Sequence, residues 1–235
     1  MMRYVSFLGV LTIAFTLFSG VAMAVDVEIA LEAELASKIQ APLVIAVPAD
    51  AKKQGGPEPD EPSNGKFIWM PGRPVTGGGG SGFAEYIVDI PKDGTYAIWG
   101  RAVAWDGNSD SFWVTWDPAD GGENPQQTQN QDLCWCAANG NTWIWDRVNR
   151  WPAGGDREWE LDKGETKLTI WSREDAAMLD CIFITDNLAA DEGAAGVREP
   201  TDEDRELQVK GARGKAVEAA GKLSTTWSRL RSQYR

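Results

Sequence analysis

The segment LDCIFIT, residues 179–185, decides the fold class of this chain. Its apolar, β-branched and aromatic residues predict a strand, and a polar turn separates it from another strand-like run at 168–171. Alternation along the strand would place Asp180 on one face with Ile182 and Ile184, and Leu179, Cys181 and Phe183 on the other face. A lone buried carboxylate is costly, so Asp180 predicts a donor, a cation or a metal ion beside it.

Two further carboxylates, Glu32 and Glu34, stand near the beginning of the chain. The surrounding segment 27–36 is compatible with a helix or a strand, and an extended backbone would put both glutamates on one face. We interpret Glu32, Glu34 and Asp180 as ligands of one calcium ion that joins the two ends of the domain, because calcium prefers several oxygen ligands. The alternative is that the glutamates are exposed strand residues and that Asp180 caps a turn.

Short strand-like segments separated by turns fill the middle of the chain. They are expected at 66–70, 83–90, 95–104, 111–116, 158–161 and 167–171. No repeated helices lie between them, which favours antiparallel pairing over a parallel sheet. The pattern predicts an all-β protein, an antiparallel β-sandwich of the jelly-roll type, with a C-terminal helical tail.

The first residues are typical of an export signal. Arg3 precedes an apolar run at 5–18, and Ala-Met-Ala at 22–24 is a small-residue cleavage site. The apolar run is short for a membrane span. We therefore predict a signal peptide at 1–24 and a secreted or extracytoplasmic protein, in the periplasm or on the cell surface, with no transmembrane segment after signal removal.

Composition divides the remainder into a domain at 25–187, a charged linker at 188–206 and a basic tail at 207–235. Apolar residues recur in the tail at alternating three- and four-residue spacing, which predicts an amphipathic helix, although its glycines weaken it. The tail is expected to contact its own domain, a partner protein or an anionic surface.

Charge and residue usage exclude several classes of function. The formal net charge is -12, and its acidic part lies in the domain, which argues against nucleic acid as a partner. The chain has no histidine, so a Ser-His-Asp triad is impossible and the commonest general base is missing. Of the three cysteines, Cys134 or Cys136 could bridge to Cys181, or Cys181 could be a buried free thiol.

A set of short motifs follows the order seen in a known group of proteins. The motifs are Glu32-Ala33-Glu34, Gly94-Thr95-Tyr96, Arg101-Ala102-Val103, Asp110-Ser111-Phe112, Trp143-Ile144-Trp145 and Leu179-Asp180-Cys181-Ile182. In this order the chain resembles the calcium-binding jelly-roll carbohydrate-binding modules of families six and thirty-five, over residues 29–187. The resemblance implies a structural calcium ion held by Glu32, Glu34 and Asp180.

Twelve tryptophans are many for a chain of this length, and exposed rings could form a flat platform for sugars. The resemblance implies that Trp69 and Trp143 bracket a sugar, and Trp105 and Trp135 are further candidates in loops. The group's usual asparagine is absent, because Met178 stands directly before the Leu-Asp pair.

A second oxygen-rich stretch contains Asp106, Asn108 and Asp110. Their alternation is similar to that of an EF-hand loop, but Ser111 occupies the position at which such a loop requires glycine. Asx-type turns account for these residues adequately.

The sequence favours non-catalytic binding of a carbohydrate polymer or glycan by an exported jelly-roll module. No nucleophile motif, nucleotide loop or zinc signature is present, so we do not expect an enzyme. The leading alternative is a structural or adhesive module that assembles with proteins at the cell envelope. Cleavage of a polysaccharide by a carboxylate pair is a more distant third.

Overall fold

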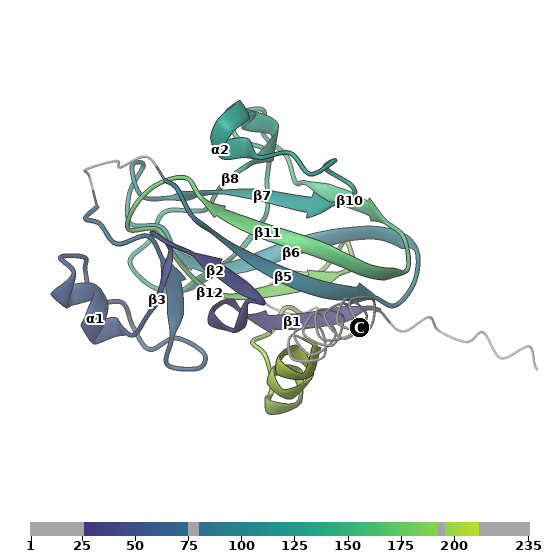
Figure 1. Ribbon diagram of the computed structural model, residues 1–235, viewed down its shortest axis with the longest axis horizontal. Coiled ribbons are helices and arrows are strands. Elements are labelled where there is room, and N and C mark those ends of the chain that lie inside the picture. The colour runs from purple at the N-terminus through teal and green to yellow at the C-terminus, as the bar shows by residue number, and fades with distance from the viewer. Residues whose placement is uncertain (1–25, 75–79, 192–195, 212–235) are drawn as a thin grey trace, which may run out of the picture.

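The structure, a computed structural model, describes residues 26–74, 80–191 and 196–211. In this part of the chain two antiparallel β-sheets form a sandwich (Figure 1), which confirms the predicted all-β fold class. The predicted signal peptide at 1–24 and most of the predicted tail lie outside the described residues.

The larger sheet has seven strands, and the last strand of the domain lies at its centre. β12 pairs with β6 along one edge and with β1 and β4 along the other. In chain order the strands are β1 (Glu28–Glu32), β3 (Val44–Ala46), β4 (Phe67–Trp69), β6 (Gly94–Val103), β9 (Ile144–Arg147), β10 (Glu158–Leu161) and β12 (Met178–Thr185).

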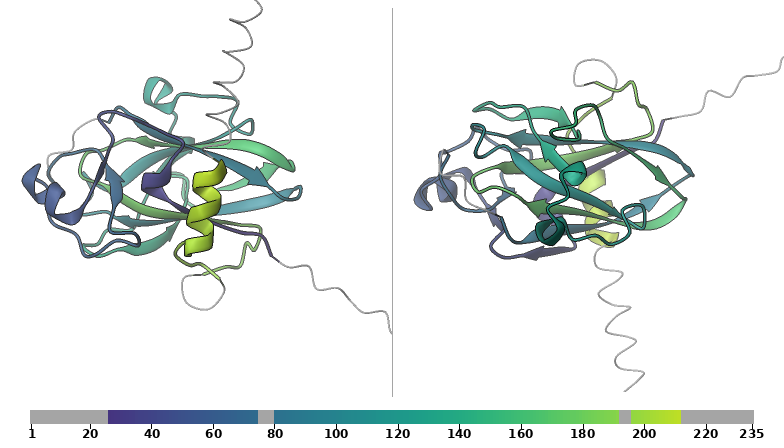
Figure 2. Two further views of the ribbon diagram at one scale, coloured as in Figure 1. Left: turned by 60° about the horizontal axis from the view of Figure 1, so that its bottom comes forward. Right: turned by 90° about the horizontal axis from the view of Figure 1, so that it is seen from above.

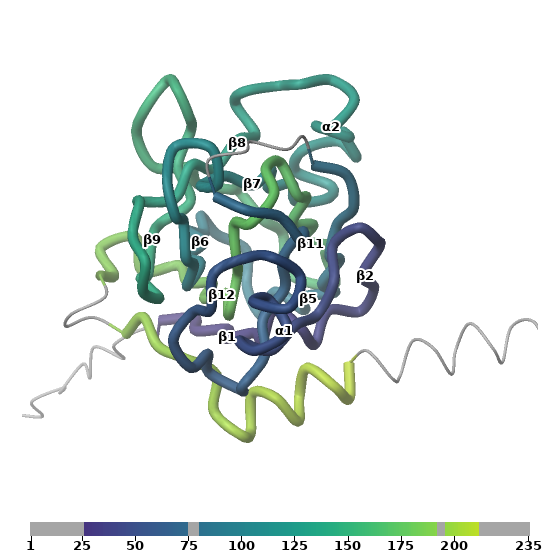
Figure 3. The backbone as a smooth tube through the Cα atoms, turned by 90° about the vertical axis from the view of Figure 1, so that its left-hand side faces the viewer, coloured from purple at the N-terminus to yellow at the C-terminus, as the bar shows by residue number. Residues whose placement is uncertain are grey.

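The smaller sheet has five strands in the order β2-β5-β11-β7-β8. Their bounds are β2 (Lys38–Gln40), β5 (Phe83–Ile90), β7 (Ser111–Asp117), β8 (Cys134–Cys136) and β11 (Gly164–Ser172). Four short helical segments connect strands: η1 (Ala33–Leu35), α1 (Pro48–Lys53), α2 (Pro125–Thr128) and η2 (Gln131–Leu133). Figure 3 views the sandwich from the end at which α1 lies.

The main core lies between the two sheets because alternate residues of each strand face inward. The smaller sheet contributes Tyr86, Trp116 and Leu168, and the larger sheet contributes Ile98 and Ile182. All five are fully or almost fully buried. We call the opposite side of the larger sheet, which faces away from the smaller one, the outer face.

A β-bulge alters the predicted alternation in β12. The register with β6 shifts between Leu179 and Cys181, so Asp180 is an extra residue without a Cα partner. Leu179 consequently packs in the main core together with Ile182 and Ile184. The prediction that Leu179 lies on the face opposite these isoleucines is wrong, because simple alternation does not hold across a bulge.

A C-terminal helix, residues 202–211, lies across β1 and appears in yellow-green in Figures 1 and 2. It begins inside the segment predicted to be a linker, and local capping explains where. The Asp204 N–H donates to Thr201 Oγ1, and the Thr201 N–H donates in return to Asp204 Oδ2. This reciprocal pair satisfies N–H groups that the first turn of a helix leaves unbonded. Among the described residues, no helix has the length and apolarity to cross a membrane.

Candidate functional site

The structure brings the three predicted carboxylates together on the outer face. Glu32 and Asp180 are fully buried, and Glu34 is 5% exposed. Ser63 joins two of them: its N–H donates to Asp180 Oδ1 at 2.9 Å, and its hydroxyl donates to Glu32 Oε1 at 3.0 Å. Asn64 Nδ2 donates to Glu34 Oε1 at 2.7 Å. We call Glu32, Glu34 and Asp180 the acidic cluster.

The local backbone explains how residues from both ends of the domain meet. Glu32 is the last residue of β1 and lies directly opposite Cys181 of β12. The chain then turns through η1, which carries Glu34. The buried Tyr86 hydroxyl donates to the Ala33 carbonyl at 2.8 Å and fixes that turn to the smaller sheet. The bulge in β12 supplies Asp180 to the same place.

Two guanidinium groups reach the acidic cluster. Arg101 Nη1 donates to Asp180 Oδ2, and Arg205 Nε donates to Glu32 Oε1 at 2.7 Å. Arg101 also pairs with Glu199, at 3.2 Å between Nη2 and Oε1. Arg205 comes from the C-terminal helix, so that helix contributes a positive charge to a buried site of the domain.

The chemistry of the donor set suits a further cation, but the spacing of its side chains in this conformation does not. Glu32 Oε2 and Glu34 Oε2 are buried and have no hydrogen-bond partner among the described residues. Orphaned carboxylate oxygens of this kind are what an oxygen-preferring cation such as calcium requires. In the described part of the chain, however, no three His, Cys, Asp or Glu side chains are gathered tightly enough to hold a metal ion. The cations that meet the cluster in this conformation are the two arginines.

Burial disfavours the charged form of all three carboxylates. It raises the pKa of Glu34 from 4.5 to about 7, although the hydrogen bond from Asn64 opposes the change. It likewise raises the pKa of Asp180 from 3.8 to about 6, against the hydrogen bond from Arg101. The pKa of Glu32 is also raised by burial, and its bond with Arg205 limits the rise. Of the three carboxylates, Glu34 therefore has its negative charge least compensated by a neighbouring cation.

These shifts predict a pH dependence of stability in the presence of a chelator. Because the raised pKa makes the folded protein bind more protons than the unfolded chain, the free energy of unfolding should decrease as the pH rises from about 4.5 to about 7. Glu34→Gln should remove much of this slope, on the order of 2 kcal/mol across the interval. Urea unfolding at several pH values measures it. The exposed Glu61→Gln is the control, and an equal slope in Glu34→Gln would contradict the assignment to Glu34.

Trp143 and Trp105 form the exposed part of an aromatic cluster near the acidic cluster. Both rings are half-buried against a second hydrophobic cluster that includes Phe67. The Trp143 ring N–H donates to the Asp60 carbonyl at 2.8 Å, and the Trp105 ring N–H donates to the Ala176 carbonyl at 3.0 Å. These bonds fix the rings while leaving part of each exposed. We call Trp105 and Trp143 the aromatic site.

The other two predicted tryptophans do not reach the surface. Trp69 is fully buried beneath the same hydrophobic cluster, and Trp135 is 1% exposed in the main core. Trp135 stacks on Phe112 at 5.4 Å and donates its ring N–H to Asp146 Oδ2. Neither ring offers a face to a ligand in this conformation, because other side chains cover both.

Arg101 and one loop connect the aromatic site to the acidic cluster. The Arg101 guanidinium lies 5.9 Å from the centre of the Trp143 ring while it bonds to Asp180. The loop that accepts the Trp143 N–H through Asp60 also supplies Ser63 to the acidic cluster. A shift of the acidic cluster would therefore move this loop, and with it the Asp60 carbonyl that holds the Trp143 ring.

Arg205, Ser63 and Asn64 were missed as site residues by the sequence analysis. The available signal was general: a basic tail beside an acidic domain and a Ser-Asn pair in a polar loop. Neither feature indicates which carboxylate a residue meets, since these contacts join positions thirty or more residues apart along the chain.

The remaining sequence candidates have structural roles. Asp106 Oδ1 accepts the Asn108 N–H at 2.9 Å, the Asx turn expected for that stretch. All three cysteines are free, and Cys181 is fully buried. Burial raises the pKa of Cys136 to about 12, which keeps its thiol protonated and unreactive at neutral pH.

The solved structures that this chain is similar to include carbohydrate-binding modules. The chain overlaps the C-terminal family 6 module of a marine laminarinase from Zobellia galactanivorans with a TM-score of 0.44 and 15% identity, over 67% of this chain and 98% of that one. It overlaps a family 35 module from Clostridium thermocellum with a TM-score of 0.43 and 13% identity, over 68% of this chain and 98% of that one. It overlaps a Podospora anserina mannanase that carries a family 35 module with a TM-score of 0.46 and 13% identity, over 74% of this chain and 29% of that one. No family model and no curated protein matches the sequence.

Proposed function

We propose that this chain is an exported, non-catalytic module that binds a polysaccharide or glycan at the aromatic site, with a structural calcium ion at the acidic cluster. The observation that carries the proposal is the pair of half-buried tryptophans, Trp105 and Trp143, whose ring N–H groups are held by main-chain carbonyls. Fixed aromatic rings lose little conformational entropy when a ligand packs on them.

The chemistry of the aromatic site suits a sugar. Sugar rings present faces of C–H groups that pack on indole rings, and their hydroxyls require donors and acceptors close by. The Arg101 guanidinium beside Trp143 and the polar residues Asp60 and Asn64 of the adjoining loop supply both kinds. Because this set contains no nucleophile paired with a base, it supports binding without catalysis.

In this proposal Glu32, Glu34 and Asp180 would hold the calcium ion. The ion would neutralise the carboxylate charge that burial otherwise penalises. It would also tie β1 and η1 to β12, and therefore stabilise the strands that carry Arg101 and the loop under Trp143.

A structural or adhesive role at the cell envelope is the second candidate function. Two large apolar side chains away from the aromatic site favour it, Ile45 at 48% exposed and Leu207 at 60% exposed. In that role a partner protein would cover one or both of these side chains.

A glycan array tests the first candidate. Purified protein should give saturable, reproducible binding to a group of related plant, algal, microbial or host glycans. It should leave the polysaccharides that it binds uncleaved on prolonged incubation. An array without hits would favour the assembly role, and release of oligosaccharides would contradict the non-catalytic assignment.

A further inference from the structure

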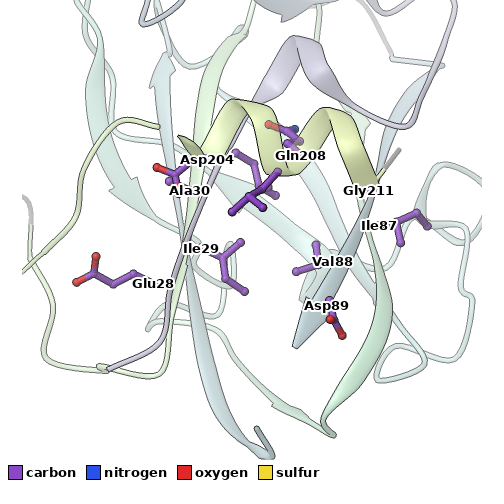
Figure 4. A pocket seen from close by; sticks show the side chains of 11 residues that line it. Glu28, Ile29, Ala30, Ile87, Val88, Asp89, Asp204, Gln208 and Gly211 are labelled. Carbon is purple, nitrogen blue, oxygen red and sulfur yellow. The ribbon is translucent and has the colours of Figure 1, made fainter. Parts of the chain in front are cut away.

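The C-terminal helix is attached to the domain almost entirely by polar contacts. None of its residues 202–211 is buried, and Leu207 is 60% exposed. A groove of about 420 Å³ separates it from the neighbouring strands (Figure 4), with Ile29 of β1 and Val88 of β5 on the opposite wall. Apolar burial therefore contributes little to docking of this helix.

Most of the hydrogen bonds between the helix and the β-sandwich involve one residue, Glu32. The Gln208 side chain forms two hydrogen bonds with the main chain of Glu32. Its Oε1 accepts the Glu32 N–H at 2.9 Å, and its Nε2 donates to the Glu32 carbonyl at 2.9 Å. Arg205 donates to the Glu32 carboxylate and, at 3.2 Å, to the Ser63 hydroxyl. The helix thereby satisfies main-chain groups of β1, whose only strand partner among the described residues is β12.

The residue that holds the helix is also a proposed calcium ligand. Glu32 Oε1 accepts from both Arg205 and Ser63, whereas Glu32 Oε2 is buried without a partner. Glu34 has the same kind of unpartnered oxygen, and Asp180 is already bonded to Arg101. In this conformation Arg205 occupies part of the position in which a second cation would balance the cluster.

We infer that Arg205 and a divalent cation compete for Glu32, so that the C-terminal helix is a latch that calcium releases. The inference rests on the calcium component of the proposed function and is independent of the sugar. A guanidinium and a divalent ion on one buried carboxylate repel each other strongly, since the protein interior screens charge poorly.

Thermodynamic linkage makes the inference measurable from both sides. If calcium weakens docking of the helix, removal of the Arg205 charge must strengthen calcium binding by the same factor. Release would also expose the Glu32 main chain and the edge of β1, a surface on which another strand can pair.

The experiment measures hydrogen exchange in the full-length protein, with calcium and with a chelator, together with calcium affinity by calorimetry. We expect calcium to speed exchange of the amides in 205–211 about tenfold, within the usual range of coupling between two sites. Arg205→Gln should bind calcium about tenfold more tightly than wild type. Lys210→Gln, on the same helix and paired within the described residues with the exposed Glu206, should bind like wild type.

Three results would overturn the inference. Equal calcium affinity in wild type and Arg205→Gln would show that the helix and the ion are independent. Slower amide exchange of the helix in calcium would show that calcium strengthens docking of the helix instead of weakening it. Binding of calcium by neither protein would remove the competing ion and the calcium component as well, while carbohydrate binding would be judged separately on the glycan array. Exchange in wild type is informative even if the variant does not fold.

Discussion

Asp180→Ala should destabilise the domain by about 3 kcal/mol, measured by urea unfolding in the presence of a chelator. The change removes the buried partner of the Arg101 guanidinium, whose side chain is only 17% exposed, and leaves it only the more exposed carboxylate of Glu199. It also leaves the Ser63 N–H without its acceptor. An unpaired buried charge costs more than the intact pair contributes, so the loss exceeds that of an ordinary surface substitution. In a domain of this size it corresponds to a melting temperature lower by roughly 10 °C.

A matched control and a double variant separate the pair from general effects of substitution. The exposed Asp162→Ala should change stability by less than about 0.5 kcal/mol. Replacing both partners, with Asp180→Leu and Arg101→Met, should recover much of the loss, because apolar residues of similar size tolerate burial. Loss of less than about 1 kcal/mol in Asp180→Ala would show that the acidic cluster does not support the fold.

Trp143→Ala should weaken glycan binding at least about thirtyfold, which corresponds to about 2 kcal/mol of binding free energy. The ring is one of two fixed aromatic surfaces at the proposed site, and alanine offers neither stacking nor the bond to Asp60. Some stability will be lost too, since the ring packs 5.6 Å from that of Phe67. Calorimetry at a temperature where the variant is fully folded isolates the effect on binding.

Trp151→Ala is the matched control for this measurement. Trp151 is 43% exposed, the most exposed tryptophan of the described chain, and it stacks with Arg173 at 5.2 Å. Since it lies outside the aromatic site, its removal should leave affinity unchanged. The opposite pattern, with binding lost in Trp151→Ala and kept in Trp143→Ala, would move the site to the surface around Trp151.

The fold class followed from the sequence because strand periodicity is a local property. The β5 and β12 segments alternate clearly enough to be placed within about one residue of their observed ends. The bulge at Asp180 could not be foreseen, since it depends on the register with β6. The C-terminal helix was expected from 207, whereas its start is set by the pair of Thr201 and Asp204.

The candidate site was predictable only where one residue type dictates its own surroundings. A carboxylate in an apolar strand requires a partner, and that reasoning brought Asp180 together with Glu32 and Glu34. Which partner is present depends on distant contacts, such as that of Arg205. For tryptophan no such rule exists, because its ring packs in protein cores and also contacts ligands at surfaces. Trp69 and Trp143 therefore looked alike in the sequence.

Nuclear magnetic resonance of the tryptophan ring N–H groups, during titration with a glycan selected on the array, tests the central claim most directly. The ring signals of Trp105 and Trp143 should shift and saturate together, because a sugar on their faces alters the shielding of N–H groups held at fixed carbonyls. Those of the buried Trp116 and the distant Trp151 should not move. Saturable binding that leaves the Trp105 and Trp143 signals in place would contradict carbohydrate recognition at this site.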